Sequence, residues 1–241
     1  MTEFTFKSIG KIKTPYREKF CIPRQAGLVP NVKGTIELER EFSSPGITAG
    51  LEGFSHIWIL FVFHKNLNKN WMPTVRPPRL GGNKKKGVFA SRSPFRPNLI
   101  GMSILELDSI EEKNGKVYLH VNSPDMMDGT PILDIKPYIP DNDIKKNARH
   151  GWLDNAPTDS KFPVTFSQQA LDFLKKEKRE MLKDQIEAIL CLDPRPPYYR
   201  MNPKDRPKED FAFGFDDFDI HFKMVDGVFL VTWIEFLAEK S

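Results

Sequence analysis

One uninterrupted apolar run limits the fold of this chain more than any other feature. Ile57–Phe63 contains only β-branched, aliphatic and aromatic residues, and it ends at His64-Lys65. The run is far shorter than the roughly 20 apolar residues that a membrane helix needs. Its length and residue types are typical of a strand that is buried on both faces. We therefore expect this strand at the centre of a β-rich domain.

Short alternating segments around this run predict further strands. The segments are Phe4–Lys13, Gly34–Leu38, Val88–Ala90, Met102–Leu107 and Lys116–Val121. The pair Asn114-Gly115 between the last two segments is a strong signal for a β-hairpin. Many short strands without a long helix predict a barrel or a sandwich for residues 1–145.

The segment Pro140–Trp152 is polar and lacks a period, and the pattern changes after it, so we place a domain boundary near residues 143–160. Ser167 is placed to cap a helix that ends near Lys176, and apolar residues at helical spacing between Met181 and Leu190 predict a second helix. Alternation from Phe218 to Met224, the turn Asp226-Gly227 and the run Val228–Ile234 predict a β-hairpin. Residues 155–241 are therefore expected to form a smaller α+β domain.

The stretch Gly87–Gly101 has the residue types of a binding site. Prolines at 94 and 97 fix the backbone after Ser93 and Arg96, so these residues follow a stiff, non-helical course. Such stiffness positions the side chains of Arg92 and Arg96. The alternative is a rigid turn between two strands with solvated arginines.

Positive charge is concentrated near this stretch. The formal net charge is only +4, but residues 76–96 contain seven cations and no carboxylate. The cations are Arg76, Arg79, Lys84, Lys85, Lys86, Arg92 and Arg96. This segment suits a polyanion such as RNA, or it is a solvated face. Arginines and tyrosines in Arg195–Arg200 fit single-stranded nucleic acid in the same way, or a packed loop.

Several common chemistries lack their motifs. Cys21 and Cys191 are far apart and are expected to be reduced bystanders. His56 and His64 lack further ligands at a usual spacing, so no metal site is expected. Glycine-rich nucleotide motifs and a nucleophilic triad are also missing. Without a signal peptide or membrane segment, the chain is expected to be a soluble cytoplasmic protein.

A second polar constellation follows at Asp128–Tyr138. Gly129 allows a turn with positive φ that leads into a strand with Asp134 and Lys136. The alternative is an ordinary Asp-Gly turn before an edge strand.

Together these motifs resemble the TrmO family of tRNA methyltransferases. The resemblance covers nearly the whole chain and rests on Pro23-Arg24-Gln25, Arg76–Asn83, Gly87–Gly101, Asp128–Tyr138 and Asp193–Pro196. It implies an N-terminal β-barrel that binds S-adenosylmethionine near a homodimer interface. The implied substrate is tRNA with threonylcarbamoyladenosine beside the anticodon, methylated at N6. The C-terminal domain is then expected to help bind tRNA.

The resemblance also implies the site residues. The expected cofactor contacts are Pro23, Arg24, Gln25, His64, Lys65, Leu107, Asp128, Gly129, Thr130 and Pro131, together with an arginine of the central motif, either Arg92 or Arg96. The expected catalytic residues are Arg92 and, as candidates for the base that removes the proton of the acceptor nitrogen, Asp134, neutral Lys136 and Tyr138. Two other classes stay open: a non-catalytic RNA-binding barrel, and a hydrolase that pairs Asp128 with Asp134.

Overall fold

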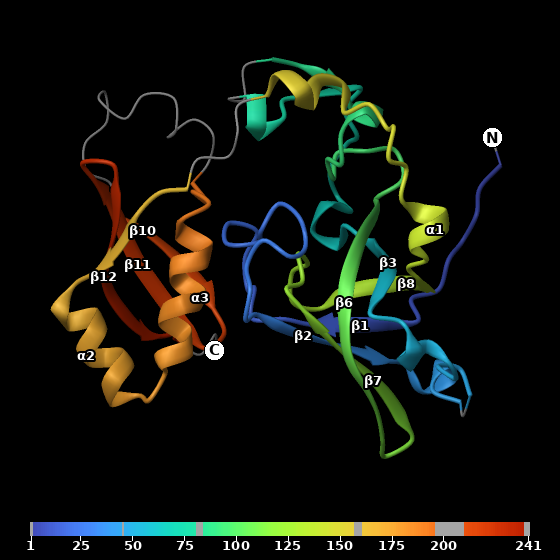
Figure 1. Cartoon of the computed structure of the whole chain (residues 1–241), viewed down its shortest axis with the longest axis horizontal. Helices are drawn as coiled ribbons and strands as arrows, with labels where there is room; N and C mark the ends of the chain where they lie inside the picture. Colours follow the sequence, from blue (N-terminus) through green and yellow to red (C-terminus); the bar gives the residue numbers. More distant parts are fainter. Residues whose placement is uncertain (1, 45, 81–83, 157–160, 196–209, 239–241) are drawn as a thin grey trace. The chain divides into compact units, whose positions relative to one another are not determined.

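The computed structural model describes residues 2–44, 46–80, 84–156, 161–195 and 210–238 (Figure 1). The chain forms two compact units, and each is described by itself. The barrel unit comprises Met1–Lys13, Gly34–Asn122 and Gly129–Thr158. The α+β unit comprises Thr14–Lys33, Ser123–Asp128 and Asp159–Ser241. Two short segments, Thr14–Lys33 and Ser123–Asp128, are therefore grouped with the C-terminal part of the chain.

Six strands close into a barrel in the order β1-β2-β7-β6-β3-β8. The strands are β1 (Gly10–Lys13), β2 (Lys33–Leu38), β3 (His56–Val62), β6 (Ile100–Lys113), β7 (Lys116–Asn122) and β8 (Thr130–Pro137). Alternate side chains fill the interior, where Ile12, Ile36, Ile59, Leu105 and Leu119 have no exposed surface. The barrel prediction is confirmed, and the sandwich alternative is excluded.

Strand β3 differs from its prediction. Ile57, Ile59 and Phe61 are buried, whereas Trp58 and Leu60 are only partly buried. A barrel wall has one inner and one outer face, so alternate residues of a strand face outward whatever their hydrophobicity. The expectation of burial on both faces is wrong, and the outer residues leave an apolar surface on the barrel.

The first strand is shorter than predicted. Strand β1 begins at Gly10, whereas alternation began at Phe4. Gly10 pairs with Leu38, the last residue of β2, so residues before it have no ladder to extend on that side. The predicted hairpin between β6 and β7 is confirmed, since Asn114 and Gly115 have φ of 53° and 70°. These positive values suit the tight turn that connects two twisted strands.

A small lobe of residues 63–99 connects β3 to β6 at one end of the barrel (Figure 1). Its elements are η3 (His64–Asn66), β4 (Thr74–Val75), η4 (Pro78–Leu80), β5 (Lys86–Gly87) and η5 (Val88–Ala90). The prediction of a strand at Val88–Ala90 is wrong. The backbone amide of Ser91 donates to the carbonyl of Val88 at 3.1 Å, which closes a helical turn there instead. The remaining elements of the barrel unit are η1 (Arg40–Phe42), η2 (Leu51–Gly53), α1 (Pro140–Asp143) and η6 (Gly151–Asn155).

The α+β unit has a four-stranded sheet in the order β10-β11-β12-β9. Its elements are β9 (Val164–Phe166), α2 (Gln168–Lys176), α3 (Glu180–Leu190), β10 (Phe211–Phe215), β11 (Phe218–Val225) and β12 (Val228–Phe236). Both helices and the β11–β12 hairpin are confirmed. The Ser167 hydroxyl accepts from the amide of Ala170 at 3.1 Å, as predicted for the helix cap. Strands β9 and β10 were not predicted.

The segment Thr14–Lys33 contributes to the core of this unit. Tyr16, Cys21, Val29 and Val32 are buried in one cluster with apolar residues of both helices and the sheet. Tyr16 forms a β-bridge with Phe215, and their rings meet edge to face with centroids 5.6 Å apart. No helix in the described parts of the chain is long and apolar enough to cross a membrane.

Candidate functional site

Three of the predicted motifs meet at one end of the barrel. Thr130 at the start of β8 pairs with Ile12 near the end of β1, and Val62 at the end of β3 pairs with Ile100 at the start of β6. His64 and Lys65 follow β3, the arginine-rich segment precedes β6, and Gly129 precedes β8. The antiparallel register therefore places these segments at the same end.

Local contacts fix this barrel end. The amide of Gly129 donates to the carbonyl of Ile12 at 2.9 Å, and Gly129 has a φ of 72°, which favours glycine. The amide of Phe63 donates to the carbonyl of Leu99 at 2.8 Å. A Cβ at Gly101 would lie 2.3 Å from the ring of Phe61, so only glycine permits this approach of β6 to β3. The turn is positioned by a central barrel strand, because β8 pairs with both β1 and β3, and not by an edge strand.

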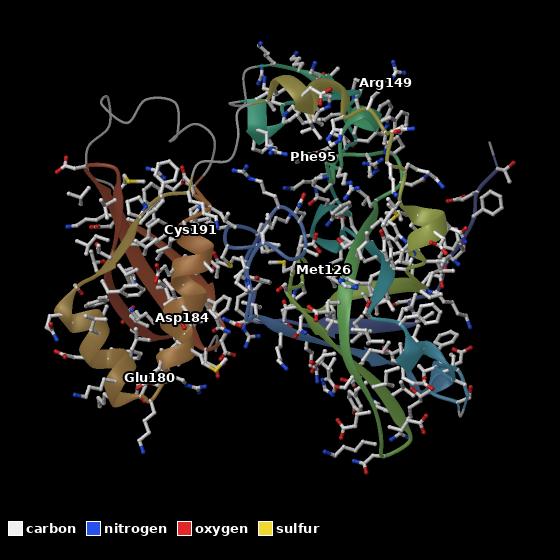
Figure 2. The ribbon with its side chains drawn as sticks, in the orientation of Figure 1. Phe95, Met126, Arg149, Glu180, Asp184 and Cys191 are labelled. Carbon is white, nitrogen blue, oxygen red and sulfur yellow. The ribbon has the colours of Figure 1, made fainter. Side chains whose placement is uncertain are left out.

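The arginine-rich segment is held by its own polar groups. Ser91 donates its hydroxyl hydrogen to the carbonyl of Val88 at 2.9 Å, and the hydroxyl of Ser93 accepts from the amide of Phe95 at 3.2 Å. The amide of Met72 donates to the carbonyl of Phe95 at 3.1 Å. Figure 2 shows Phe95 and Arg149 at this end of the barrel unit. The prolines and these hydrogen bonds together give the stiff course that the sequence predicted.

The two arginines of this segment differ in their surroundings. Arg96 is partly buried, and its Nη1 donates to the carbonyls of Ser91 and Ser93 at 3.2 and 3.3 Å. Arg92 is exposed, and it has no hydrogen-bond or ion-pair partner among the residues that the structure describes. Arg96 therefore supports the loop, whereas Arg92 presents its guanidinium to solvent.

Asp128 lies in the α+β unit, where other groups hold its carboxylate. Its Oδ1 accepts from the amide of Thr14 at 3.0 Å, and its Oδ2 pairs with Arg17 Nη1 at 3.3 Å. Arg17 also donates to the carbonyl of Asp216 at 2.9 Å. Both oxygens of Asp128 thus have partners within the protein, which fixes the turn at Gly129.

The loop with Pro23, Arg24 and Gln25 belongs to the same unit as Asp128. Pro23 is buried, and Arg24 and Gln25 are exposed. Two residues later, the amide of Gly27 donates to the carbonyl of Ser123 at 3.0 Å. This bond connects the loop to the segment that leads to Asp128.

The candidate bases lie further along β8. Asp134 and Lys136 form an ion pair of 2.8 Å, and their side chains are 47% and 63% exposed. They stand opposite Leu60 and Trp58 of β3, residues that face outward. Asp134 has its own cation here and Asp128 is paired with Arg17, so each carboxylate of the hydrolase hypothesis already has a basic partner.

Tyr138 and Leu107 lie toward the other end of the barrel from Gly129. The amide of Tyr138 donates to the carbonyl of His56 at 3.0 Å, and the amide of Leu107 donates to the carbonyl of Ser55 at 2.9 Å. Strand β8 separates Tyr138 from Thr130 by roughly 25 Å at the usual rise per residue. Within one chain the structure does not bring Tyr138 and Leu107 together with His64 and Gly129.

Buried ionisable groups lie in the core of the α+β unit. Burial raises the pKa of the Cys21 thiol to about 12, which keeps it protonated and unreactive near neutral pH. Burial also raises the pKa of the Tyr16 hydroxyl, which has no hydrogen-bond partner in the described structure. Cys21 and Cys191 are both free thiols, as expected from their spacing.

Sequence reasoning missed one cluster of potential metal ligands. Asp219, His221 and Glu235 lie on β11 and β12, and their ligand atoms are within 4.8 Å of one another. His221 Nε2 lies 3.5 Å from Asp219 and 3.3 Å from Glu235. The alternation of β11 places Asp219 and His221 on one face, and the hairpin brings Glu235 opposite Asp219. Spacing along the chain gave no sign of this grouping.

The second basic element predicted from sequence begins with a structural arginine. Arg195 is only 7% exposed, forms hydrogen bonds with Asp193 at 2.8 and 3.0 Å, and lies over the ring of Phe229. Its guanidinium is therefore not available to RNA, contrary to the expectation for this residue. The rest of that element, residues 196–200, lies outside the described residues.

Comparison with known proteins decides the family. The model of the tRNA-methyltransferase O N-terminal domain matches residues 11–144, and that of the TrmO C-terminal domain matches residues 159–237. The chain belongs to the TrmO family. By family it is a tRNA methyltransferase, as the resemblance implied.

Individual TrmO relatives match over nearly their full length. The tRNA (adenine(37)-N6)-methyltransferase of Escherichia coli (strain K12) is 41% identical over 237 residues, covering 98% of this chain and 99% of the relative. A Pseudomonas aeruginosa relative named as a putative S-adenosylmethionine-dependent methyltransferase, RcsF, is 41% identical over 88% of this chain and 89% of its own length. The crystal structure of TrmO from P. aeruginosa matches with a TM-score of 0.76 at 32% identity, over 98% of this chain and 99% of that one.

Proposed function

We propose that this TrmO protein uses S-adenosylmethionine to methylate N6 of threonylcarbamoyladenosine beside the anticodon of tRNA. Its relative from E. coli is named as a tRNA (adenine(37)-N6)-methyltransferase, and the similarity spans almost the full length of both chains. The observation that carries the proposal is the stiff segment before β6. It presents the exposed guanidinium of Arg92 at the end of the barrel where His64 and Gly129 also lie.

The donor groups at this end fit S-adenosylmethionine. A guanidinium binds a carboxylate through paired hydrogen bonds, and Arg92 is open to such a ligand. A Cβ at Gly129 would meet no described atom within 4 Å, so a ligand has room against the backbone of the turn. When bound, the cofactor supplies an activated methyl group. The chain's own residues then have to orient the two partners and exclude water.

The remaining predicted contacts divide between the two units. His64, Lys65, Arg92, Thr130 and Pro131 belong to the barrel end described above. Pro23, Arg24, Gln25 and Asp128 belong to the α+β unit, where Asp128 orients the turn through Thr14 and Arg17. Arg96 acts as a positioning residue, because its Nη1 is bonded to its own loop. Leu107 is the predicted contact farthest along the barrel.

The acceptor differs from plain adenosine by a carboxylate on its threonylcarbamoyl group. The basic segment of residues 76–96, which has seven cations and no carboxylate, offers that group a charged partner. A site that hydrogen-bonds one substrate group discriminates strongly against an analogue without it. The protein is therefore expected to select tRNA with the modified adenosine.

The reaction also requires that a proton leaves the acceptor nitrogen. Asp134, Lys136 and Tyr138 are the candidates for the base. Asp134 and Lys136 lie on the outer face of β8, where their ion pair provides both an acceptor and a cation, and Tyr138 follows the end of this strand. Of the three, Tyr138 lies farthest from the barrel end that carries Gly129, so it serves the site only if a second copy brings it there.

A homodimer would place a second copy on the outer face of β3, β6 and β8. There Leu60 stands between Met102 and Asp134, and Trp58 stands between Ile104 and Lys136. Met102 is 45% exposed, which is typical of an apolar face that pairs with another surface. We further propose that residues 1–145 are the methyltransferase domain, that residues 155–241 help bind tRNA, and that the protein is cytoplasmic.

Methyl transfer to two tRNA substrates tests the function. The protein is incubated with S-adenosylmethionine and with the same tRNA, either carrying or lacking threonylcarbamoyladenosine. We expect methyl incorporation at N6 only in the modified tRNA. Equal incorporation in both would refute the selection by the carboxylate. A non-catalytic RNA-binding barrel would show no incorporation and no rise in melting temperature with S-adenosylmethionine.

A further inference from the structure

We propose that Phe89 is a platform on which an unpaired base of the tRNA substrate stacks. The proposal rests on the proposed function, since it states how that substrate is held. Phe89 is 79% exposed, although large apolar side chains are usually buried. An exposed ring in a segment with many polar contacts is a candidate for recognition of a ligand.

The backbone holds this ring in place on both sides. The preceding residue, Val88, is buried, and its amide donates to the carbonyl of Pro73 at 3.0 Å. The carbonyl of the following residue, Ala90, accepts from the indole nitrogen of Trp152 at 2.8 Å. Phe89 therefore projects from a fixed turn, and little backbone freedom is lost when a base packs against it.

The same lobe exposes further large apolar side chains. The ladder between β4 and β5 continues to the hydrogen bond between Val88 and Pro73, so Met72 and Phe89 follow the same end of this ladder. Met72 and Trp71 are 50% and 55% exposed. The lobe of residues 63–99 thus exposes Trp71, Met72 and Phe89, the last two at the same end of the ladder.

The charge of the lobe identifies the partner. Residues 76–96 have seven cations and no carboxylate, so a phosphate backbone is attracted to the same segment that presents the ring. Proteins that bind single-stranded nucleic acid combine such a basic groove with aromatic side chains. A second copy of this chain would bring two like-charged lobes together, which disfavours it as the occupant. Bases within a duplex are already stacked, so the partner is an unpaired loop of the tRNA.

Binding measurements without methyl transfer test the proposal. The affinity for a tRNA transcript is measured for the wild type, Phe89→Ala, Phe89→Trp and Phe4→Ala over a salt series. We expect Phe89→Ala to bind about 5-fold to 100-fold more weakly, the range for loss of one stacked base. The slope of affinity against salt should stay unchanged, because no cation is removed. Phe89→Trp should bind as well as the wild type.

Phe4→Ala is the matched control, because Phe4 is 74% exposed but lies outside the basic lobe. A duplex RNA of equal length should bind the wild type and Phe89→Ala equally. Unchanged tRNA affinity of Phe89→Ala overturns the proposal, as does an equal loss for the duplex. A change from dimer to monomer in Phe89→Ala, measured by sedimentation, would instead assign the ring to a protein contact. Methyl transfer is not needed here, so a wild type that binds through Phe89 without methylating tRNA refutes only the proposed function.

Discussion

The guanidinium of Arg17 binds the carboxylate of Asp128 across 111 positions of the chain, with Nη1 and Oδ2 3.3 Å apart. The amide of Thr14 occupies the other carboxylate oxygen at 3.0 Å. Asp128 thus fixes the turn before β8. The sequence pattern predicted a functional turn here, and the structure shows that the carboxylate of Asp128 binds Thr14 and Arg17.

We expect Asp128→Ala to lower the free energy of unfolding by about 1–2 kcal/mol, because a backbone amide and a guanidinium lose their acceptor. Binding of S-adenosylmethionine should weaken as the turn loosens, while tRNA affinity should hardly change. Urea unfolding and calorimetric titration with each ligand measure these effects. Asp217→Ala is the control, since its 3.4 Å contact with Arg17 is exposed and should contribute little. Wild-type cofactor affinity in Asp128→Ala would show that the turn does not serve the cofactor.

Substitution of the two arginines before β6 should have different effects on the reaction. Arg92→Ala should reduce the turnover number on the order of 100-fold at saturating tRNA and cofactor, because its group is available to the reacting partners. Arg92→Lys should retain only part of the wild-type turnover number, since an ammonium lacks the planar pair of donors. Single-turnover methylation measures both.

Arg96→Ala should act through the loop. Loss of its bonds to the carbonyls of Ser91 and Ser93 should destabilise the segment, and both KM and the turnover number should change. Faster proteolysis within residues 84–99 would report this loosening. Stable Arg96→Ala protein with a pure loss of turnover, beside an active Arg92→Ala, would reverse the two roles.

Glu37 predicts a pH dependence of the barrel. Hydrogen bonds from Lys116 and Lys13 lower the pKa of Glu37 below its ordinary value of 4.5. A lowered carboxyl pKa stabilises the folded state above pH 4.5, and this contribution is lost as the pH falls through the folded value. Between pH 6 and roughly 3, the wild type should therefore lose more stability than Glu37→Gln.

Urea unfolding at several pH values measures this difference. Glu41→Gln is the control, because Glu41 pairs with Lys7 at 3.2 Å with both side chains mostly exposed. Parallel pH profiles for the wild type and Glu37→Gln would contradict the expectation.

Local sequence chemistry predicted those parts of the fold that local contacts determine. The positive φ of Asn114 and Gly115 and the capping of α2 by Ser167 depend on a few neighbouring residues. Tertiary contacts determined the rest. Tyr16 pairs with Phe215, nearly 200 positions later, and this contact places Thr14–Lys33 with the α+β unit.

The candidate site was also only partly predictable from the sequence, because tertiary contacts determine the role of its residues. Arg92 and Arg96 share a motif and a residue type, and only the fold of the loop onto Arg96 distinguishes them. Asp219, His221 and Glu235 meet because two strands pair in one register, which their spacing alone does not reveal.

Arg195 should be required for stability and not for RNA contact. Arg195→Met removes the guanidinium that binds both oxygens of the buried Asp193 carboxylate, which should cost about 3–5 kcal/mol. Urea unfolding measures this loss, and Asp193→Asn combined with Arg195→Met should recover part of it because no buried charge remains. Below its melting temperature, Arg195→Met should bind tRNA with wild-type affinity. A stable variant with weakened tRNA binding would make Arg195 an RNA contact after all.

The lysines at 84, 85 and 86 should steer tRNA without taking part in the reaction. Lys84 and Lys85 are exposed, and Lys86 is partly exposed at the start of β5. Neutralising all three residues should weaken tRNA binding and flatten its salt dependence by about 0.7 for each single-strand phosphate that the lysines no longer neutralise. Turnover at saturating tRNA should remain, because flexible point charges attract the substrate without orienting its reacting atoms. Single-turnover methylation over a salt series tests this against Phe89→Ala, which should weaken binding with the slope intact. A triple variant that is slow even at saturating tRNA would move the reaction toward the lysine segment and away from Arg92.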